Sequence, residues 1–262
     1  MKLIAKLAYQ INMHFNIIAS GSKGNATLVI YKQTVILIDM GIPFVRLEEG
    51  LKEVGLSFDD LNGAIFTHNH SDHISGVRFL SPKIMYGLKG TLSSLANVVE
   101  LFVPFMIGDL EITPIKTSHD AVNPCGFYIK GGDETLVYLT DTGCFCEENL
   151  PLIKNPTYLI LESNHDIQME LKTNRSYALK QRILSDQGHL CNEDSAIAAC
   201  EIIGNNTKEI ILAHLSEEAN TPEVALDAYQ KVFNYKGVDI SKYHVRCANQ
   251  YVPTLGGRDY EN

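Results

Sequence analysis

The chain has 262 residues, of which 45% are hydrophobic and 20% charged, and 22 basic against 31 acidic side chains give a formal charge of −9. These are ordinary values for a globular protein, and a chain of this length buries enough surface to fold without disulfide bonds. No apolar run approaches the roughly 20 residues of a membrane span, so we expect no membrane partner. The acidic balance excludes a generally basic nucleic-acid coat but leaves a nucleic-acid substrate open, because local patches decide contacts.

The N-terminal stretch MKLIAKLAYQINMHF does not resemble a secretory signal peptide, because Lys6 and Gln10 interrupt its apolar run. Met13 stands just before the first strand-like run, so we expect residues 1–14 to be an extension or the result of a start assigned too early. Residues 15–262 contain no repeat or linker and are predicted to form a single domain. The six cysteines form no CxxC pair, which favours reduced thiols and a cytoplasmic location.

The first part of the chain is predicted to be mainly strands, and the second part contains more predicted helices. Apolar runs predict strands at 15–19, 26–31, 34–39, 64–67, 110–117, 126–130, 136–140, 157–162, 210–213 and 243–248. Helical spacing predicts helices at 46–54, 74–80, 177–184, 193–203 and 222–233, with Asn192 as the cap of the fourth. This order favours two sheets packed face to face with helices outside.

The motif H-x-H-x-D-H follows the predicted strand 64–67 and contains His68, His70, Asp72 and His73. Imidazole and carboxylate groups suit Zn²⁺, Mn²⁺ or iron. On an extended turn, side chains at i and i+2 project together, so His68 and His70 can reach one ion. Asp72 and His73, after a bend, can reach another. A solvated histidine-rich loop is the weaker interpretation, because the cluster directly follows an apolar strand.

Three further candidates stand at the ends of strand-like runs: His119 in KTSHD, Asp141 in YLTDTG and His214 in LAHLS. An open sheet presents ligands along one edge in this way. A single histidine in such a place is usually a hydrogen-bonded structural residue. Three candidates in series favour a metal site instead.

Together these motifs resemble the metallo-β-lactamase superfamily. The resemblance implies an α/β fold, the αβ/βα four-layer sandwich, with a site for two divalent metal ions, zinc or manganese or else iron, at one edge. It also implies that His68, His70 and His119 bind the first ion, that Asp72, His73 and His214 bind the second, and that Asp141 bridges both. The true β-lactamases have a cysteine near the place of Asp141. The aspartate here disfavours antibiotic hydrolysis and favours the hydrolase and nuclease branches.

Four longer motifs narrow the resemblance to the WalJ/YycJ-like branch, which is associated with 5′-to-3′ exonuclease action on double-stranded DNA. They are IASGSKGNAT (18–27), LESNHD (161–166), LKQRI (179–183) and GHLCN (188–192). The last motif departs from the expected GHLSN, since Cys191 stands in place of serine. The combination implies a DNA substrate for this chain.

Glu162 and His189 are the candidate proton-transfer pair, as in RNase Z-type relatives. The implied mechanism is two-metal hydrolysis of a phosphodiester, in which the metals supply hydroxide at neutral pH. Asp72 would bind a metal and help to orient the attacking water, and His189, held by Glu162, would protonate the departing 3′ oxygen. The alternatives are a hydrogen-bonding role for His189 at a helix start and a structural ion pair for Glu162.

Substrate contacts are expected from a basic stretch that precedes His189 and from two polar loops. Arg182 is the first candidate for a phosphate contact, although charge on a helix is more often simple solvation. The other substrate-binding candidates are Lys180, Ser22 and Asn164. Asp39, at the end of a strand, is either a carboxylate that orients a ligand histidine or a turn former.

Two other functions fit parts of the sequence. A two-metal site would equally hydrolyse a small thioester or lactone; the basic stretch and the GHLCN histidine argue against it. A non-catalytic, metal-stabilised protein that binds partners is the second alternative, and the full ligand set argues against that.

Overall fold

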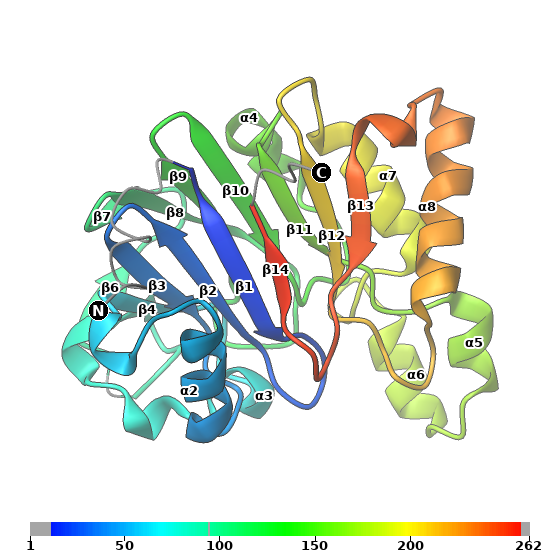
Figure 1. Cartoon of the computed structure of the whole chain (residues 1–262). Helices are drawn as coiled ribbons and strands as arrows, with labels where there is room; N and C mark the ends of the chain where they lie inside the picture. The colour runs from blue at the N-terminus through cyan, green and yellow to red at the C-terminus, as the bar shows by residue number, and fades with distance from the viewer. Residues whose placement is uncertain (1–11, 94, 258–262) are drawn as a thin grey trace.

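The computed structural model describes residues 12–93 and 95–257 as two seven-stranded sheets with helices on their outer faces (Figure 1). The predicted N-terminal extension, residues 1–14, lies almost wholly outside the described residues, and the first strand begins at His14. That residues 15–262 form one domain stays a prediction. No described helix is long and apolar enough to cross a membrane.

The first sheet has the strand order β14-β1-β2-β3-β4-β5-β6. Strands β14 to β3 are antiparallel neighbours, and the pairs from β3 to β6 are parallel. The strands are β1 (His14–Ala19), β2 (Ala26–Tyr31), β3 (Thr34–Ile38), β4 (Gly63–Phe66), β5 (Met85–Leu88), β6 (Asn97–Val99) and β14 (Thr254–Gly256).

The second sheet has the order β13-β12-β11-β10-β9-β8-β7. Its β7–β10 pairs are antiparallel and its β10–β13 pairs are parallel. The strands are β7 (Phe105–Ile107), β8 (Leu110–Lys116), β9 (Cys125–Gly131), β10 (Glu134–Leu139), β11 (Tyr158–Glu162), β12 (Glu209–Ala213) and β13 (His244–Cys247).

Three apolar layers explain why the central strands are apolar on both faces. The middle layer joins the two sheets, for example through Phe15 and Ile36 of the first and Phe127 of the second. The second layer packs the first sheet against α2 (Phe44–Glu53), and the third packs the second sheet against α7 (Asn192–Ile202) and α8 (Pro222–Lys236). A sheet covered on both faces gives continuous apolar strands. The predicted four-layer αβ/βα sandwich is therefore confirmed.

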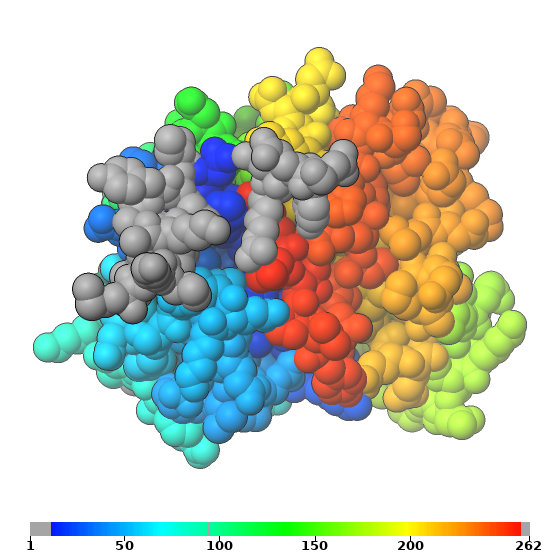
Figure 2. All heavy atoms as spheres, in the orientation of Figure 1, coloured from blue at the N-terminus to red at the C-terminus, as the bar shows by residue number. Residues whose placement is uncertain are grey.

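Four short helices lie in the segments that connect the strands. They are α3 (Ser71–Ile74), α4 (Leu150–Ile153), α5 (Ile167–Lys172) and α6 (Tyr177–Ile183). Single 3-10 turns are η1 (Phe58–Asp60), η2 (Val77–Phe79), η3 (Pro82–Ile84), η4 (Glu147–Asn149) and η5 (Ile240–Lys242). In the space-filling view, the red C-terminal segment with β14 fills the middle of the face turned to the viewer, between the N-terminal half and α8 (Figure 2).

Two local predictions were wrong. A helix over 74–80 does not form: α3 ends at Ile74, and the N–H of Gly76 donates instead to Met40 O at 2.8 Å, which leaves only a 3-10 turn at η2. The cap of α7 is not Asn192 but Cys191, whose Sγ accepts from the N–H of Asp194 at 3.4 Å. All six cysteines are free, as expected.

Candidate metal centre

The candidate ligands gather where strands of both sheets end. In the second sheet, Asp141 follows β10, Glu162 ends β11 and His214 follows β12. The parallel register pairs Glu162 with Ala213, so the side chains that follow emerge at one edge. In the first sheet, Asp39 follows β3 and His68 follows β4.

Three of these positions have left-handed backbone conformations. The φ angles are 58° at Asp39, 56° at Asp141 and 56° at His214. Residues other than glycine seldom adopt such angles, and strain of this kind gathers at functional sites. The backbone therefore turns sharply at the strand ends and directs these side chains to one place.

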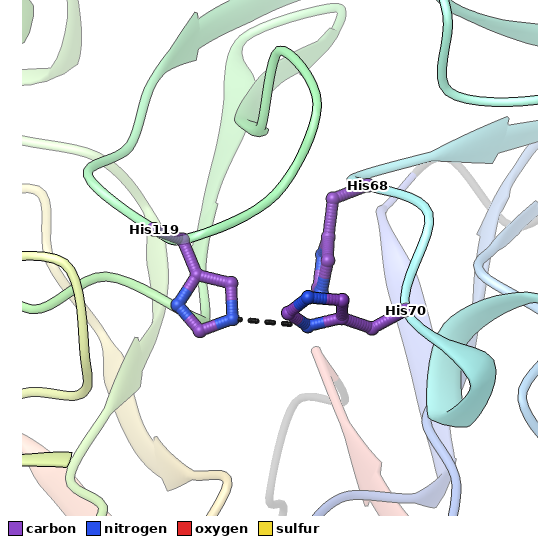
Figure 3. Close-up of side chains that lie close together, drawn as sticks. All are labelled: His68, His70 and His119. Carbon is purple, nitrogen blue, oxygen red and sulfur yellow. Dashed lines mark hydrogen bonds between the residues drawn. The ribbon is translucent and has the colours of Figure 1, made fainter. Parts of the chain in front are cut away.

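His68, His70 and His119 form the first group, with one ligand atom of each within 4.8 Å of the others. Nε2 of His119 lies 3.2 Å from Nδ1 of His70, and Figure 3 shows the three rings converging from two separate segments. The structure thus brings together the three residues expected for the first ion.

Asp72, His73 and His214 form the second group by the same measure. Oδ2 of Asp72 lies 3.6 Å from Nε2 of His73 and 3.9 Å from Nε2 of His214. These are the residues expected for the second ion. They come from α3 and from the end of β12, so the group joins the two sheets.

Asp141 lies between the two groups. Its Oδ1 is 3.8 Å from Nε2 of His119 and 3.6 Å from Nε2 of His214, and its Oδ2 is 3.2 Å from Nε2 of His73. Asp141 also forms a potential ligand group with His68 and His73. This is the position that a bridging carboxylate requires, although bridging itself stays a prediction.

The described residues fit divalent cations. Nε2 of His68, Nε2 of His214 and Oδ2 of Asp141 are buried and have no hydrogen-bond partner among the described residues. Buried polar atoms are otherwise almost always paired. Nitrogen donors combined with carboxylates suit Zn²⁺, Mn²⁺ and iron.

The ring orientations of His68 and His73 are set by Thr67 and Asp39. Asp39 Oδ2 accepts from His73 Nδ1 and from the Thr67 hydroxyl, each at 2.8 Å. Because that hydroxyl donates to Asp39, it accepts from His68 Nδ1 at 3.0 Å. Nε2 is thereby the nitrogen of each ring that could bind a metal ion, and in His73 it lies 3.0 Å from Nδ2 of Asn25. Outer partners orient metal-binding histidines in this way. Asp39 is thus an orienting carboxylate.

His119 and His214 follow the same rule. The carbonyl of Gly188 accepts from Nδ1 of His119 at 2.9 Å, and Glu162 Oε1 accepts from Nδ1 of His214 at 3.0 Å. Nε2 of each ring therefore remains for a metal ion. Gly188 did not appear among the sequence candidates, since a backbone carbonyl leaves no mark in the pattern of side chains.

Glu162 is wholly buried and serves both His189 and His214. Its Oε1 accepts from Nδ1 of His189 at 2.7 Å as well as from His214, and its Oε2 accepts from the N–H of Thr142 at 2.8 Å. Burial raises the pKa of Glu162, but the charge of His189 and these hydrogen bonds prevail and lower it to about 2. An ionised Glu162 only accepts, so Nε2 of His189 is left for another partner.

The buried carboxylates and histidines compensate one another electrostatically. Burial raises the pKa of Asp141, yet the charges of His214 and His73 hold it well below its usual value. Conversely, burial disfavours the charged form of His73, but Asp141 and Asp39 raise its pKa to about 10. Bound divalent cations would supply the positive charge that this arrangement demands.

Two glycine- and serine-rich turns support the centre. Gly143 of the TDTG motif packs against the turn at 185–188, and a Cβ atom there would lie 2.3 Å from Ser185 O. The turn at 20–25, between β1 and β2, also approaches the site. Ser20 Oγ accepts from the N–H of His214, and the N–H of Asn25 donates to Asp72 O, each at 2.8 Å.

The proposed substrate contacts are already engaged within the protein, apart from one. Arg182 Nε and Nη2 form a bidentate ion pair with Asp120, the neighbour of His119. Lys180 donates to Leu171 O and Thr173 O, each at 2.7 Å, and so closes the end of α5. Buried Asn164 donates to His214 O at 2.8 Å. Ser22 is exposed.

The comparisons with known proteins agree with this fold. The model of the beta-lactamase superfamily domain matches residues 34–215. The exodeoxyribonuclease YycJ of Bacillus anthracis is 32% identical over an alignment of 260 residues, which covers 93% of this chain and 98% of that protein. The exodeoxyribonuclease WalJ of Streptococcus pneumoniae serotype 2 is 34% identical over 232 residues, covering 82% and 86% of the two chains.

Among solved structures, the metallo-beta-lactamase fold protein YhfI of Bacillus subtilis superposes with a TM-score of 0.70 at 19% identity. The superposition covers 94% of this chain and all of YhfI. At that identity the likeness concerns the fold alone.

Proposed function

The chain belongs to the beta-lactamase superfamily, and on that premise we propose that it is a metal-dependent phosphodiesterase that degrades double-stranded DNA from the 5′ end. The observation that carries the proposal is the single oxygen, Glu162 Oε1, that binds both His189 and His214. It joins a candidate proton donor to a candidate metal ligand. The exodeoxyribonuclease names of the two relatives supply the substrate class.

Two divalent ions are proposed, zinc or manganese or else iron. His68, His70 and His119 would hold the first, Asp72, His73 and His214 the second, and Asp141 would bind both. Bound ions of this kind supply a nucleophilic hydroxide at neutral pH and neutralise charge on the phosphate. Asp72 is partly exposed and would also help to orient the attacking water by accepting a hydrogen bond from it.

His189 is proposed to be the proton donor to the departing 3′ oxygen. Its side chain is 18% exposed, whereas Glu162 is fully buried, so the ring alone is accessible to a substrate. With Nδ1 fixed by Glu162, the transferable proton would be on Nε2. Breaking the P–O3′ bond leaves a 3′ alkoxide, and proton transfer from Nε2 neutralises it as it forms.

Arg182 is proposed to contact a phosphate of the DNA. Asp120 binds its Nε and Nη2, and Nη1 has no hydrogen-bond partner among the described residues. The guanidinium is thus held in one orientation while part of it remains accessible, since the side chain is 49% exposed. A chain with a net charge of −9 needs local cations of this kind to hold DNA.

Duplex DNA labelled separately at each 5′ and 3′ end tests the proposal. The metal-loaded protein should release mononucleotides from the 5′ end, and the His189→Ala variant should retain its metal content but lose most of the rate. Hydrolysis of a thioester or lactone without cleavage of DNA would favour the small-molecule hydrolase. Metal binding without either reaction would favour a non-catalytic binding protein.

A further inference from the structure

A groove of about 460 Å³ lies outside the metal centre, between α7 and the segment 143–150. Its lining combines apolar side chains with carboxylates. The apolar part is formed by Phe145, Leu150, Leu190, Ile197 and Ala198. This is large enough to accept several side chains of a binding partner.

One face of α7 forms a wall of the groove. Asp194, Ile197 and Glu201 line it at positions i, i+3 and i+7, which lie on one side of a helix. Ile197 is 40% exposed although its neighbours Ala196 and Ala198 are buried. An exposed isoleucine between two carboxylates is a pattern suited to an amphipathic partner.

The rim of the groove is acidic. Glu147, Asp186, Asp194 and Glu201 line it and are exposed, and within the described residues none of them forms an ion pair. The adjacent lysine, Lys116, is bound to Glu148 at 2.7 Å. This charge repels phosphates, so the groove does not belong to the path of the DNA.

A metal ion is also a poor occupant. The groups of ligand atoms close enough to hold an ion, among residues 12–93 and 95–257, include none of these four carboxylates. A small polyamine would pair with the rim but would leave the apolar floor without a matching surface. A chain segment with basic and apolar side chains satisfies both.

We propose that this groove is the docking site of a basic amphipathic peptide segment from a partner protein. Leucine-like side chains would contact Phe145 and Ile197, and lysine or arginine side chains would pair with Glu147, Asp194 and Glu201. Helix-in-groove recognition commonly combines an apolar face with charged flanks in this way. Charge complementarity would also speed the encounter and make it salt-dependent.

The groove lies next to the loop that carries His189. Leu190 lines the groove, and its N–H donates to Glu162 Oε2 at 3.4 Å. Gly188, two residues beyond Asp186, accepts from His119. A docked segment would therefore contact, from outside, the loop that carries His189.

Binding of a fluorescein-labelled leucine–lysine peptide of about 14 residues, measured by anisotropy on the full chain, tests the proposal. The triple variant Glu147→Gln/Asp194→Asn/Glu201→Gln should weaken binding at least about tenfold at low salt. The matched control Glu49→Gln/Glu53→Gln/Asp59→Asn removes the same charge from exposed positions on and after α2 and should change binding less than about twofold.

The apolar contribution is tested separately with Ile197→Ser and with a peptide in which serine replaces leucine; each should weaken binding. Hydrogen exchange should show protection at 143–150 and 194–201 in the complex. Equal weakening by the groove variant and its control would reduce the effect to net charge and overturn the proposal. So would efficient displacement of the peptide by spermine, or no binding by the unmodified chain.

Discussion

Glu162 holds His189 by a 2.7 Å hydrogen bond from Nδ1 to Oε1, and this bond ties the candidate proton donor to the metal centre. The same oxygen accepts from His214 at 3.0 Å. A change at Glu162 therefore acts on two functions at once, whereas a change at His189 acts on one. This difference separates proton transfer from metal binding by experiment.

The Glu162→Gln variant should lose both activity and part of its metal. Oε1 accepts from both Nδ1–H groups and Oε2 accepts from the N–H of Thr142, so in either orientation of the glutamine amide its NH₂ group faces a donor and the hydrogen bonds around the imidazoles are disturbed. We expect a rate loss of about 10²–10⁴-fold together with weaker binding of the second ion. Steady-state kinetics and metal analysis on the same preparation measure both. His189→Ala is the control and should lose rate while keeping its metals. Unchanged metal content in Glu162→Gln would show that Glu162 does not support metal binding through His214.

Asp141→Ala should lose metal more severely than any single histidine variant. Asp141 lies within 4 Å of ligand nitrogens in both groups, at His119, His73 and His214, so its loss removes a donor from both ions. Metal analysis after purification gives the ratio of ions per chain. The comparison variant is His214→Ala, which should lose mainly one ion. Two intact sites in Asp141→Ala would exclude a bridging role.

The Cys191→Ser variant should be more stable. Cys191 Sγ caps α7 through a 3.4 Å bond to the N–H of Asp194, and serine oxygen is a stronger acceptor and a preferred cap. The gain should be about 0.5–1 kcal/mol, or roughly 1–4 °C in melting temperature for a domain of this size. Thermal unfolding of the pair checks it, with Cys191→Ala as the uncapped reference. Equal melting temperatures for the serine and alanine variants would show that Cys191 contributes through its burial alone.

Burial of His165 predicts a loss of stability in mild acid. Desolvation lowers its pKa from 6.5 to about 4, so the folded state prefers the neutral ring. The stability that this provides is fully present above pH 6.5 and is lost as the pH falls from 6.5 towards 4, by about 3 kcal/mol. Denaturant unfolding at several pH values should show this slope, and His165→Gln should reduce it. An unchanged slope in the variant would assign the acid sensitivity to other groups.

The strand ends could be predicted from the sequence because each candidate ligand closely follows an apolar run. H-x-H-x-D-H, Asp141 and His214 therefore identified the residues that the fold brings together. The partners of charged side chains could not be predicted in the same way. Arg182 reads as a free cation in a basic stretch, but its carboxylate, Asp120, is 62 residues away in the loop after β8. A long-range pair of this kind depends on loop packing rather than on local pattern.

Short elements also escaped prediction for physical reasons. The strands β6 and β7 have three residues each, too few to show a period. The helix α5 begins at a cap, Asp166, whose Oδ1 accepts from the N–H of Met169 at 2.8 Å, and this cap is the last residue of the LESNHD motif. Asn164 of the same motif stays a predicted substrate contact, and its amide donates to the backbone carbonyl of His214.

Arg182→Ala should weaken the contact with DNA and leave the chemical step intact. DNA carries one charge about every 1.7 Å along its axis, and each phosphate contact adds close to one unit to the salt dependence of binding. Asp120 binds Nε and Nη2 of the guanidinium, and Nη1 has no hydrogen-bond partner among the described residues. Removal of Arg182 should therefore raise the KM for DNA and flatten the dependence of KM on salt. Hydrolysis of bis-p-nitrophenyl phosphate, which has no second phosphate to contact, should remain nearly unchanged.

The ion pair provides a control for this prediction. Asp120→Asn keeps Arg182 but removes the carboxylate charge that orients it. That carboxylate lies 3.5 Å from Nε2 of His119. If Arg182 contacts DNA, Arg182→Ala should impair the cleavage of DNA but not that of the small phosphodiester. Asp120→Asn should retain most of the salt dependence of the KM for DNA. An equal loss on DNA and on the small phosphodiester in Arg182→Ala would mean that the pair instead holds the loop of His119 in place. In that case metal analysis of Arg182→Ala should show loss of the first ion, because His70, His119 and Asp120 lie together at this side of the centre.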